Sequence, residues 1–322
     1  LVDTAMLRAK GFATEEIPGG CFCCRFNSLV DAAQRLDSTT SPDAFIAEPV
    51  GSCTDLVATV TYPLRRMYGD RYSIAPLSVL VDPVRAERIF GLAEGGRFSE
   101  KVLYIYRKQL EEADLIVITK TDLIDAERVE RLRARLATEY SRAEIFTVSA
   151  RNGDGLEAWF CAVENAEQIE RGTMEVDYET YADGEALLGW LNATVALHAD
   201  PPTETEPVLR ALADGVRHAL GDAEIAHLKM TLSPDTGLGD VAVINLVRND
   251  FVPELSLRLE GPVSSGQLII NLRAEAPPEA LREAVQIAVE TLPSNFPGVT
   301  AQLEHLEFFR PGKPEPTHRV HL

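Results

Sequence analysis

Three of the five cysteines in this 322-residue chain, Cys21, Cys23 and Cys24, lie within four consecutive positions. Thiols this close in sequence cannot all pair as disulfides without severe strain. As thiolates they can converge on one soft or borderline metal ion, such as Zn²⁺ or Cu⁺. The alternative is a group of inert cysteines buried in a turn. The spacing favours a metal site, or metal-linked redox chemistry, over that alternative.

A second group of residues that can carry out chemistry follows the apolar run at residues 115–118. This run has the composition of a buried strand. The sequence there is Thr119-Lys120-Thr121-Asp122. The Asp122 carboxylate can accept hydrogen bonds from the N1–H and the exocyclic amine of guanine, an edge that adenine lacks. The aliphatic stem of Lys120 can cover the base. Taken alone, the same loop is equally consistent with an aspartate that caps the next helix.

Two further polar segments follow predicted strands. Residues 144–148 lead into Ser149 and Ala150, which can contact a base from its other side. Residues 43–48 are expected to form a short buried strand ending at Glu48, with Gly51 three positions later. A carboxylate at Glu48 can hold Mg²⁺ through water, and the Gly51 N–H can bind a terminal phosphate. The alternative for residues 48–51 is an ordinary turn.

In this order, the motifs resemble those of the CobW-like metal-trafficking GTPases, relatives of HypB and UreG. That family carries Cys-x-Cys-Cys after a glycine, as at residues 20–24, then Glu-x-x-Gly, as at 48–51, then Asn/Thr-Lys-x-Asp, as at 119–122. The resemblance covers about residues 1–165, and Asp3 occupies the place of an acid that the family carries upstream of its cysteines. It implies that the chain binds GTP and Mg²⁺ beside a metal site.

The family's phosphate-binding loop, Gly-x4-Gly-Lys-Ser/Thr, has no counterpart in this sequence. The nearest run, Gly91 to Phe98, has arginine and phenylalanine where the lysine and the hydroxyl residue belong. The chain begins with Leu1, so the resemblance implies a GTPase truncated before this loop. The full-length protein is expected to hydrolyse GTP. The 322-residue fragment alone is expected to be inactive, because the loop supplies most phosphate binding.

The function that the resemblance implies is a GTP-dependent metallochaperone, which carries Zn²⁺ to a client metalloprotein. Co²⁺ and Ni²⁺ remain alternatives for the metal, and a homodimer is possible. A second hypothesis is a non-catalytic metal-binding or regulatory module with a degenerate nucleotide site. A third is a thiol redox protein that uses Cys23 and Cys24, against which the strain of a disulfide between adjacent residues counts.

Four other residues carry side chains that can bind a metal. Cys53 lies two positions after Gly51 and either approaches the cysteine cluster in one nucleotide state or packs as a small core residue, the interpretation we favour. Cys161 lies in a helical pattern and is predicted to be in the core. His318 and His321 near the C-terminus are expected to belong to a mobile tail rather than to a metal site.

Composition limits the class of partner. The formal net charge is −19, with 45% hydrophobic and 25% charged residues, as in an ordinary globular protein. That charge repels nucleic acid and anionic membrane surfaces, so neither is expected as a partner. No apolar run is long enough to cross a membrane. Cysteines that are few and clustered suit the reducing cytoplasm.

Strand and helix patterns alternate in the first half of the chain, which predicts an α/β fold. We expect a doubly wound, mostly parallel, P-loop-NTPase-like sheet followed by a second, smaller α+β domain. The predicted boundaries are 1–170 for the GTPase-like domain, 171–205 for a connecting region, 206–310 for the α+β domain and 311–322 for a tail. Residues 198–207, rich in proline and threonine, are expected to be a linker. Strands are predicted at 78–81, 115–118, 144–148, 225–232, 241–248, 254–260, 267–273 and 299–308, and helices at 29–36, 101–113, 126–140, 208–220 and 278–292.

Overall fold

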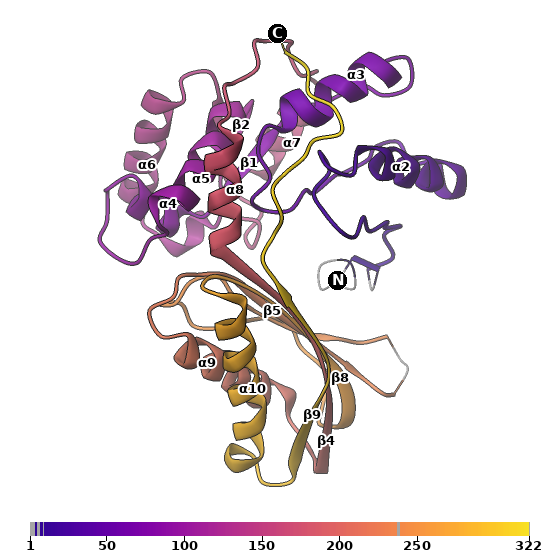
Figure 1. Cartoon of the computed structure of the whole chain (residues 1–322), viewed down its shortest axis with the longest axis vertical. Coiled ribbons are helices and arrows are strands. Elements are labelled where there is room, and N and C mark those ends of the chain that lie inside the picture. Colours follow the sequence, from indigo (N-terminus) through magenta and orange to yellow (C-terminus); the bar gives the residue numbers. More distant parts are fainter. Residues whose placement is uncertain (1–3, 5–6, 9, 237–238, 322) are drawn as a thin grey trace. The chain divides into compact units, whose positions relative to one another are not determined.

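The computed structural model describes residues 4, 7–8, 10–236 and 239–321, and the chain divides into two units (Figure 1). The parallel unit comprises Ile17–Ala33, Ala44–Gly184 and Lys313–Leu322. The antiparallel unit comprises Leu1–Glu16, Gln34–Asp43 and Glu185–Gly312. These limits differ from the predicted boundaries, because the chain leaves the parallel unit after Gly184 and returns to it at Lys313.

The parallel unit is built on a three-stranded sheet of β1 (Ser78–Val81), β2 (Leu115–Ile118) and β3 (Glu144–Thr147). The strands lie in the order β1-β2-β3, and both pairs are parallel. All four residues of β2 are buried, as the apolar sequence of this central strand predicts. Because the strands are parallel, their C-terminal ends lie at one edge of the sheet. The polar residues that follow them are therefore brought together.

Helices flank this sheet and supply the rest of its core. The N-caps of α4 and α6 are aspartates, Asp82 and Asp125, whose carboxylates accept from the backbone N–H three residues later at 3.0 and 2.9 Å. Leu132 and Leu136, one helical turn apart on α6, are fully buried with Ile116 of β2. The helices of the unit are α2 (Phe26–Thr40), η1 (Val57–Thr61), α3 (Tyr62–Tyr68), α4 (Pro83–Ile89), α5 (Glu100–Glu112), η2 (Thr121–Leu123), α6 (Ala126–Glu139) and α7 (Leu156–Glu164), and α8 (Tyr178–Leu187) leads into the other unit.

The expected strand at residues 43–48 is wrong. These residues form no strand, Ile46 is 99% exposed and Phe45 is also exposed. A strand requires a partner for its backbone N–H and C=O groups. Among the described residues, β1 is the edge strand of the parallel sheet, and no further strand pairs with its free side. The apolar composition of this run is therefore not sufficient to make it a strand.

The antiparallel unit contains one six-stranded sheet in the order β7-β6-β5-β8-β4-β9. Alternate residues of β4, including Leu191, Ala193 and Val195, are buried against α9 and α10, which cover one face of the sheet (Figure 1). This confirms the predicted α+β architecture. Its elements are β4 (Leu188–Thr203), α9 (Thr205–Leu220), β5 (Ile225–Pro234), β6 (Ala242–Leu246), β7 (Glu254–Leu257), β8 (Val263–Glu275), α10 (Pro278–Asn295) and β9 (Val299–Phe309).

The expected connecting region at 171–205, with its linker at 198–207, is wrong for most of its length. Residues 178–187 are helical, and β4 runs from Leu188 to Thr203 between β8 and β9. Ala199 still pairs with Val299, so the ladder continues into the proline-rich stretch. The alternating apolar residues of β4 outweigh the loop-like composition at its end. Among the described helices, none combines the length and the apolar character needed to cross a membrane.

Candidate functional site

The clustered cysteines lie in a tight turn directly before α2. The backbone N–H groups of Cys24 and Arg25 both donate to the carbonyl oxygen of Cys21, at 3.1 and 3.0 Å. Gly19 enters the turn with a φ of 79°, in the left-handed region that favours glycine. A Cβ at Gly19 would also lie 3.1 Å from the Arg25 guanidinium. The conformation of the turn therefore favours glycine at position 19.

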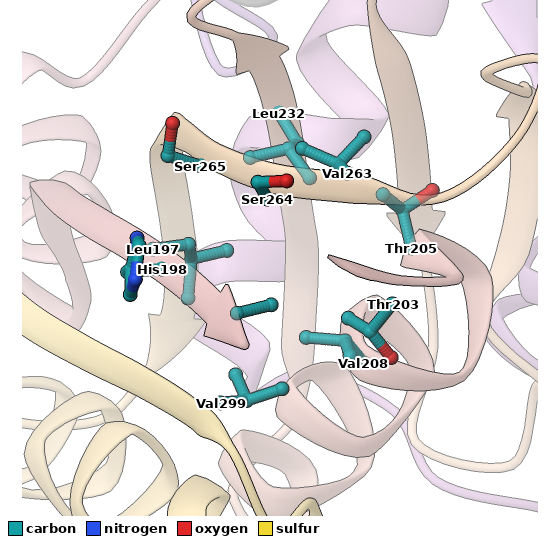
Figure 2. Close-up of a pocket in the computed structure, with 11 residues that line it drawn as sticks. Leu197, His198, Thr203, Thr205, Val208, Leu232, Val263, Ser264, Ser265 and Val299 are labelled. Atoms are coloured by element: carbon teal, nitrogen blue, oxygen red, sulfur yellow. The ribbon is translucent and has the colours of Figure 1, made fainter. Parts of the chain in front are cut away.

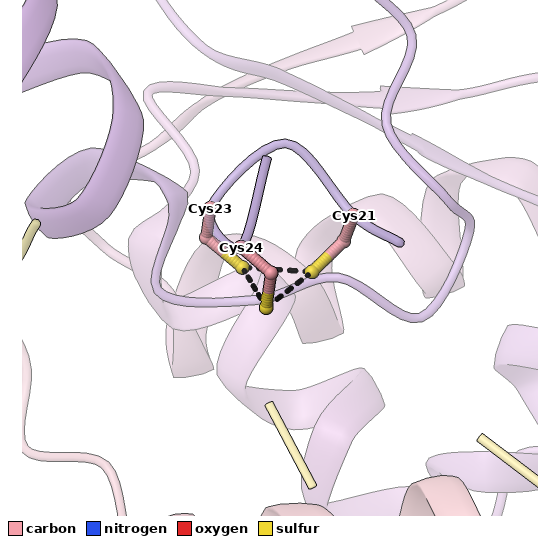
Figure 3. A group of neighbouring side chains, drawn as sticks. All are labelled: Cys21, Cys23 and Cys24. Atoms are coloured by element: carbon pink, nitrogen blue, oxygen red, sulfur yellow. Dashed lines mark hydrogen bonds between the residues drawn. The ribbon is translucent and has the colours of Figure 1, made fainter. Parts of the chain in front are cut away.

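Figure 3 shows the three sulfur atoms of Cys21, Cys23 and Cys24 turned toward one another. The Sγ–Sγ distances are 2.8 Å from Cys21 to Cys23, 3.4 Å from Cys21 to Cys24 and 3.7 Å from Cys23 to Cys24. Cys23 is 1% exposed, and the other two cysteines are half-buried. The cluster is thus accessible from one side and closed on the other.

This geometry fits a zinc ion. With Zn–S bonds of about 2.3 Å, a tetrahedral ion separates its sulfur ligands by about 3.8 Å. The Cys23–Cys24 distance is already close to that value, and the Cys21–Cys23 distance must widen by about 1 Å. Among the residues that the structure describes, these three supply the group of cysteine, histidine or acidic ligand atoms that lie within 4.8 Å of one another.

The three thiols have unequal acidity. Hydrogen bonds, first with Cys23 and then with Cys24, lower the pKa of the Cys21 thiol. The hydrogen bond with Cys21 is the largest cause that raises the pKa of Cys23 and also that of Cys24, and burial adds to both. Of the three thiols, Cys21 is therefore the one that ionises most readily. A bound metal must displace the protons of the other two thiols.

The C-terminal tail, residues 313–321, packs along the cysteine turn. The Glu315 N–H donates to the Sγ of Cys24 at 3.3 Å, and the Thr317 N–H donates to the carbonyl oxygen of Cys23 at 2.8 Å. The His318 ring meets the Phe26 ring edge-on, with centroids 4.9 Å apart. The tail that the sequence suggests to be mobile is therefore part of the wall around the cysteines. N–H donors to sulfur favour the thiolate form.

The residues that directly follow the Glu48-x-x-Gly51 motif pack beside the cysteines. Glu48 is exposed, and the Gln109 side chain of α5 donates to the carbonyl oxygens of Gly51 and Cys53, both at 2.9 Å. The Cys53 side chain is buried in one apolar cluster with Cys23. The structure thus joins two motifs that the sequence separates by more than twenty positions.

A buried ion pair joins the tail to the same segment. The Asp55 carboxylate, 1% exposed, accepts from the Nε of Arg319 and from the hydroxyl of Tyr178, both at 2.7 Å. Asp55 has a φ of 63°, which is uncommon for a residue with a side chain. Arg319 also donates to the carbonyl oxygen of Met174. Sequence reasoning missed this pair, since no local pattern links Asp55 to Arg319.

Glu112, at the end of α5, is a second buried acid that the sequence did not reveal. It accepts from the hydroxyl of Thr54 and from the N–H of Val57, each at 3.1 Å. Burial raises the pKa of the Glu112 carboxyl to about 8. Together with Gln109, this residue makes α5 the platform that holds residues 51–57.

We expect the free energy of unfolding to fall as the pH rises from about 5 to about 8, by up to about 1.4 kcal/mol per pH unit. The pKa of Glu112 is about 8 in the folded state against an ordinary value of 4.5, so unfolding releases a proton in this range. Glu112→Gln should remove the slope, as measured by urea unfolding at several pH values. Glu111→Gln, an exposed neighbour on the same helix, is the control. An equal slope in all three proteins would contradict the assignment.

The residues predicted to bind guanine meet at the C-terminal edge of the parallel sheet. Thr119 donates its hydroxyl to the carbonyl oxygen of Val81 at 3.0 Å, and the Nζ of Lys120 lies 3.1 Å from Asp82. Ser149 donates its hydroxyl to Asp122 at 2.7 Å. The loops after β1, β2 and β3 are therefore tied to one another.

Three details complete this edge. Lys120 has a φ of 52°, a backbone conformation that often accompanies functional sites. Ala150 is exposed next to Ser149, and Arg151 lies 3.8 Å from the second oxygen of Asp122. Asp3, the acid expected upstream of the cysteines, lies outside the described residues.

Cys161 corrects a prediction. It was expected in the core, yet it is exposed on α7, a helix in which no residue is fully buried. A small pocket in the antiparallel unit, between β4, β8 and α9, has no predicted site residue in its lining (Figure 2). Apolar side chains such as Leu197, Val208 and Val299 line most of it.

Residues 1–147 match the family model described as the nucleotide-binding domain of CobW, HypB and UreG. The match includes all three strands of the parallel sheet, so this part of the chain is an α/β nucleotide-binding domain. This part of the chain is similar to the CobW/HypB/UreG family. The fold class expected from the sequence, a P-loop-NTPase-like α/β unit followed by an α+β unit, is confirmed.

Two solved structures are similar to the chain. A Zn(II)-bound triple mutant of the YjiA GTPase is 18% identical, with a TM-score of 0.29, and the alignment covers 81% of this chain and 76% of that one. The Zn(II)-bound YjiA GTPase from E. coli is also 18% identical, with a TM-score of 0.23 and coverages of 71% and 67%. No curated protein matches the chain. The family assignment therefore rests on the sequence match.

Proposed function

We propose that this protein is a GTP-dependent metallochaperone that binds a transition metal, Zn²⁺ by preference, and delivers it to a client metalloprotein. The observation that carries the proposal is the convergence of three thiols, Cys21, Cys23 and Cys24, in a nucleotide-binding domain of this family. The zinc ion is cargo rather than a resident cofactor. Co²⁺ and Ni²⁺ are alternative cargoes, because three sulfur ligands do not define a coordination geometry.

The proposed guanine site is the edge formed by the loops after β2 and β3. Asp122 accepts from N1–H and the exocyclic amine of the base, the Lys120 stem covers one face, and Thr119 shapes the loop. Ser149 holds the Asp122 carboxylate in place, as its 2.7 Å hydrogen bond supports. Ala150 is exposed beside it and contacts the base from the other side.

The proposed phosphate end involves Glu48 and Gly51. An exposed carboxylate is a suitable hard ligand for Mg²⁺, so Glu48 would hold the ion through water. When bound, Mg²⁺ would neutralise part of the negative charge of the phosphates. The Gly51 N–H binds the terminal phosphate. Because this sequence has no Gly-x4-Gly-Lys-Ser/Thr run, hydrolysis of GTP by the 322-residue chain alone is expected to be negligible.

The two sites are coupled through residues 48–53 in this proposal. Contact of Gly51 with the terminal phosphate orders this segment beside the cysteine turn, and hydrolysis of GTP releases it. The metal then passes to the client. The net charge of −19 supports a protein client rather than a nucleic acid or an anionic membrane. We place the protein in the cytoplasm, where thiols stay reduced, and a homodimer remains a prediction.

We expect the chain to bind one Zn²⁺ with an affinity that falls steeply as the pH falls. Because the pKa values of Cys23 and Cys24 are raised, at least these two thiols must lose a proton when the metal binds, so the affinity should change at least about a hundredfold per pH unit. Competition with a chromophoric chelator of known proton affinity, between pH 6.5 and 8, measures this slope. A chain that binds no zinc, or binds it equally at every pH, would overturn the proposed metal site.

A further inference from the structure

A fourth thiol of the parallel unit, the buried Cys53, lies against the cysteine cluster. It is 3% exposed and belongs to the apolar cluster that contains Cys23, with Cys21 and Cys24 packed against it. The Cys53 thiol is one of the neighbours that lower the pKa of the Cys21 thiol, after Cys23 and Cys24. Cys53 therefore packs beside the three clustered cysteines rather than in a remote part of the core.

The position of Cys53 is fixed by its neighbours. Its N–H donates to the carbonyl oxygen of Val50 at 2.8 Å, and its carbonyl oxygen accepts from Gln109 at 2.9 Å. The next residue, Thr54, donates to the buried carboxyl of Glu112 at 3.1 Å. These hydrogen bonds hold Cys53 beside the cysteine cluster in the state that the structure describes.

Three thiolates leave one position of a tetrahedral zinc ion to be filled. The two tail histidines are engaged elsewhere, since His318 packs on Phe26 and His321 contacts Arg319. Cys161 is exposed on α7. Of these candidates, Cys53 is the thiol that already touches the cluster.

We propose that Cys53 is the fourth thiolate ligand of the zinc site and that it is the ligand under nucleotide control. This inference rests on the proposed function and adds a residue and a route of regulation to it. Only Ser52 separates Cys53 from Gly51. A shift of Gly51 toward or away from a terminal phosphate therefore moves Cys53 with it. With Cys53 in place the site is a closed four-sulfur site, and with Cys53 withdrawn it has an open position for a ligand from the client.

The test uses the 322-residue chain with Co²⁺ and Zn²⁺ as probes. Cys53→Ser and Cys53→Ala should each reduce the sulfur-to-cobalt charge-transfer absorption by about a quarter, because one thiolate of four is lost. Both should lower zinc affinity at least about tenfold, the usual effect of weakening even an outer-shell partner. Stoichiometry should stay at one metal. Cys161→Ser, which changes an exposed thiol, should match the unmodified chain in both measurements.

The outcomes separate this inference from the proposed function. If the unmodified chain binds one metal and both Cys53 variants, folded by circular dichroism, show its cobalt spectrum and zinc affinity, Cys53 is only a core residue and the inference is wrong. If the unmodified chain binds no zinc, the proposed function and the inference fail together. The alanine variant keeps the test decisive where a buried serine hydroxyl disturbs packing.

Discussion

Replacing Cys21, Cys23 and Cys24 together with serine will reduce zinc binding from one ion per chain to none. Each substitution removes a soft sulfur ligand and leaves a hydroxyl that zinc binds far more weakly. A structural zinc site contributes about 10–16 kcal/mol of binding free energy, so the loss of three ligands removes stoichiometric binding. Equilibrium dialysis at micromolar zinc, with the metal measured by atomic absorption, gives the result directly.

The same variant supplies a second measurement. Zinc that binds only the folded state raises its free energy of unfolding by about 4 kcal/mol at a thousand times the dissociation constant. The unmodified chain and Cys161→Ser should therefore show a zinc-dependent rise in melting temperature, and the triple variant should show none. A triple variant that still binds one zinc ion with unchanged affinity would place the metal elsewhere.

Replacing Arg319 with alanine will destabilise the parallel unit by about 3–5 kcal/mol, because it leaves the buried Asp55 carboxylate without its cation. Asp55 is 1% exposed, so water cannot replace the lost partner. Tyr178 remains as a hydrogen-bond donor but carries no positive charge. The loss should appear as a lower urea midpoint with little change in the slope of the transition.

Two further variants test the cause of that loss. Arg133→Ala breaks an exposed pair with Glu130 and should cost less than about 1 kcal/mol. Adding Asp55→Asn to Arg319→Ala should recover part of the stability, because the amide can be buried without a charge. If Arg319→Ala costs no more than Arg133→Ala, the pair does not stabilise the fold.

The sequence was sufficient to predict features that depend only on residues close together in the chain. The cysteine turn and the β2 strand could be predicted because ligand spacing and a continuous apolar run are properties of neighbouring residues. Residues 43–48 and 198–207 were misread for the opposite reason. The first needs a strand partner that its composition does not reveal, and the second continues a ladder begun at Leu188.

The parts of the site that escaped prediction are contacts between distant positions. Asp55 and Arg319 are 264 positions apart, and neither lies in a pattern that marks it. Gln109 and Glu112 look like ordinary polar residues of an amphipathic helix until residues 51–57 are seen to lie against them. Cys53 could be noticed from its place after Gly51, but only the fold shows that it packs in one cluster with the other three thiols.

The return of the chain to the parallel unit at Lys313 has a consequence for protein synthesis. The cysteine turn is translated before residues 185–312, whereas Glu315, Thr317 and Arg319 are added only after them. At about 5–20 residues per second, the interval between Cys24 and Glu315 is on the order of tens of seconds. Throughout it, the nascent thiols lack the amide donors and the ion pair that later enclose them. The wall around the cysteine turn is therefore completed only when Glu315, Thr317 and Arg319 have been translated, long after the turn itself.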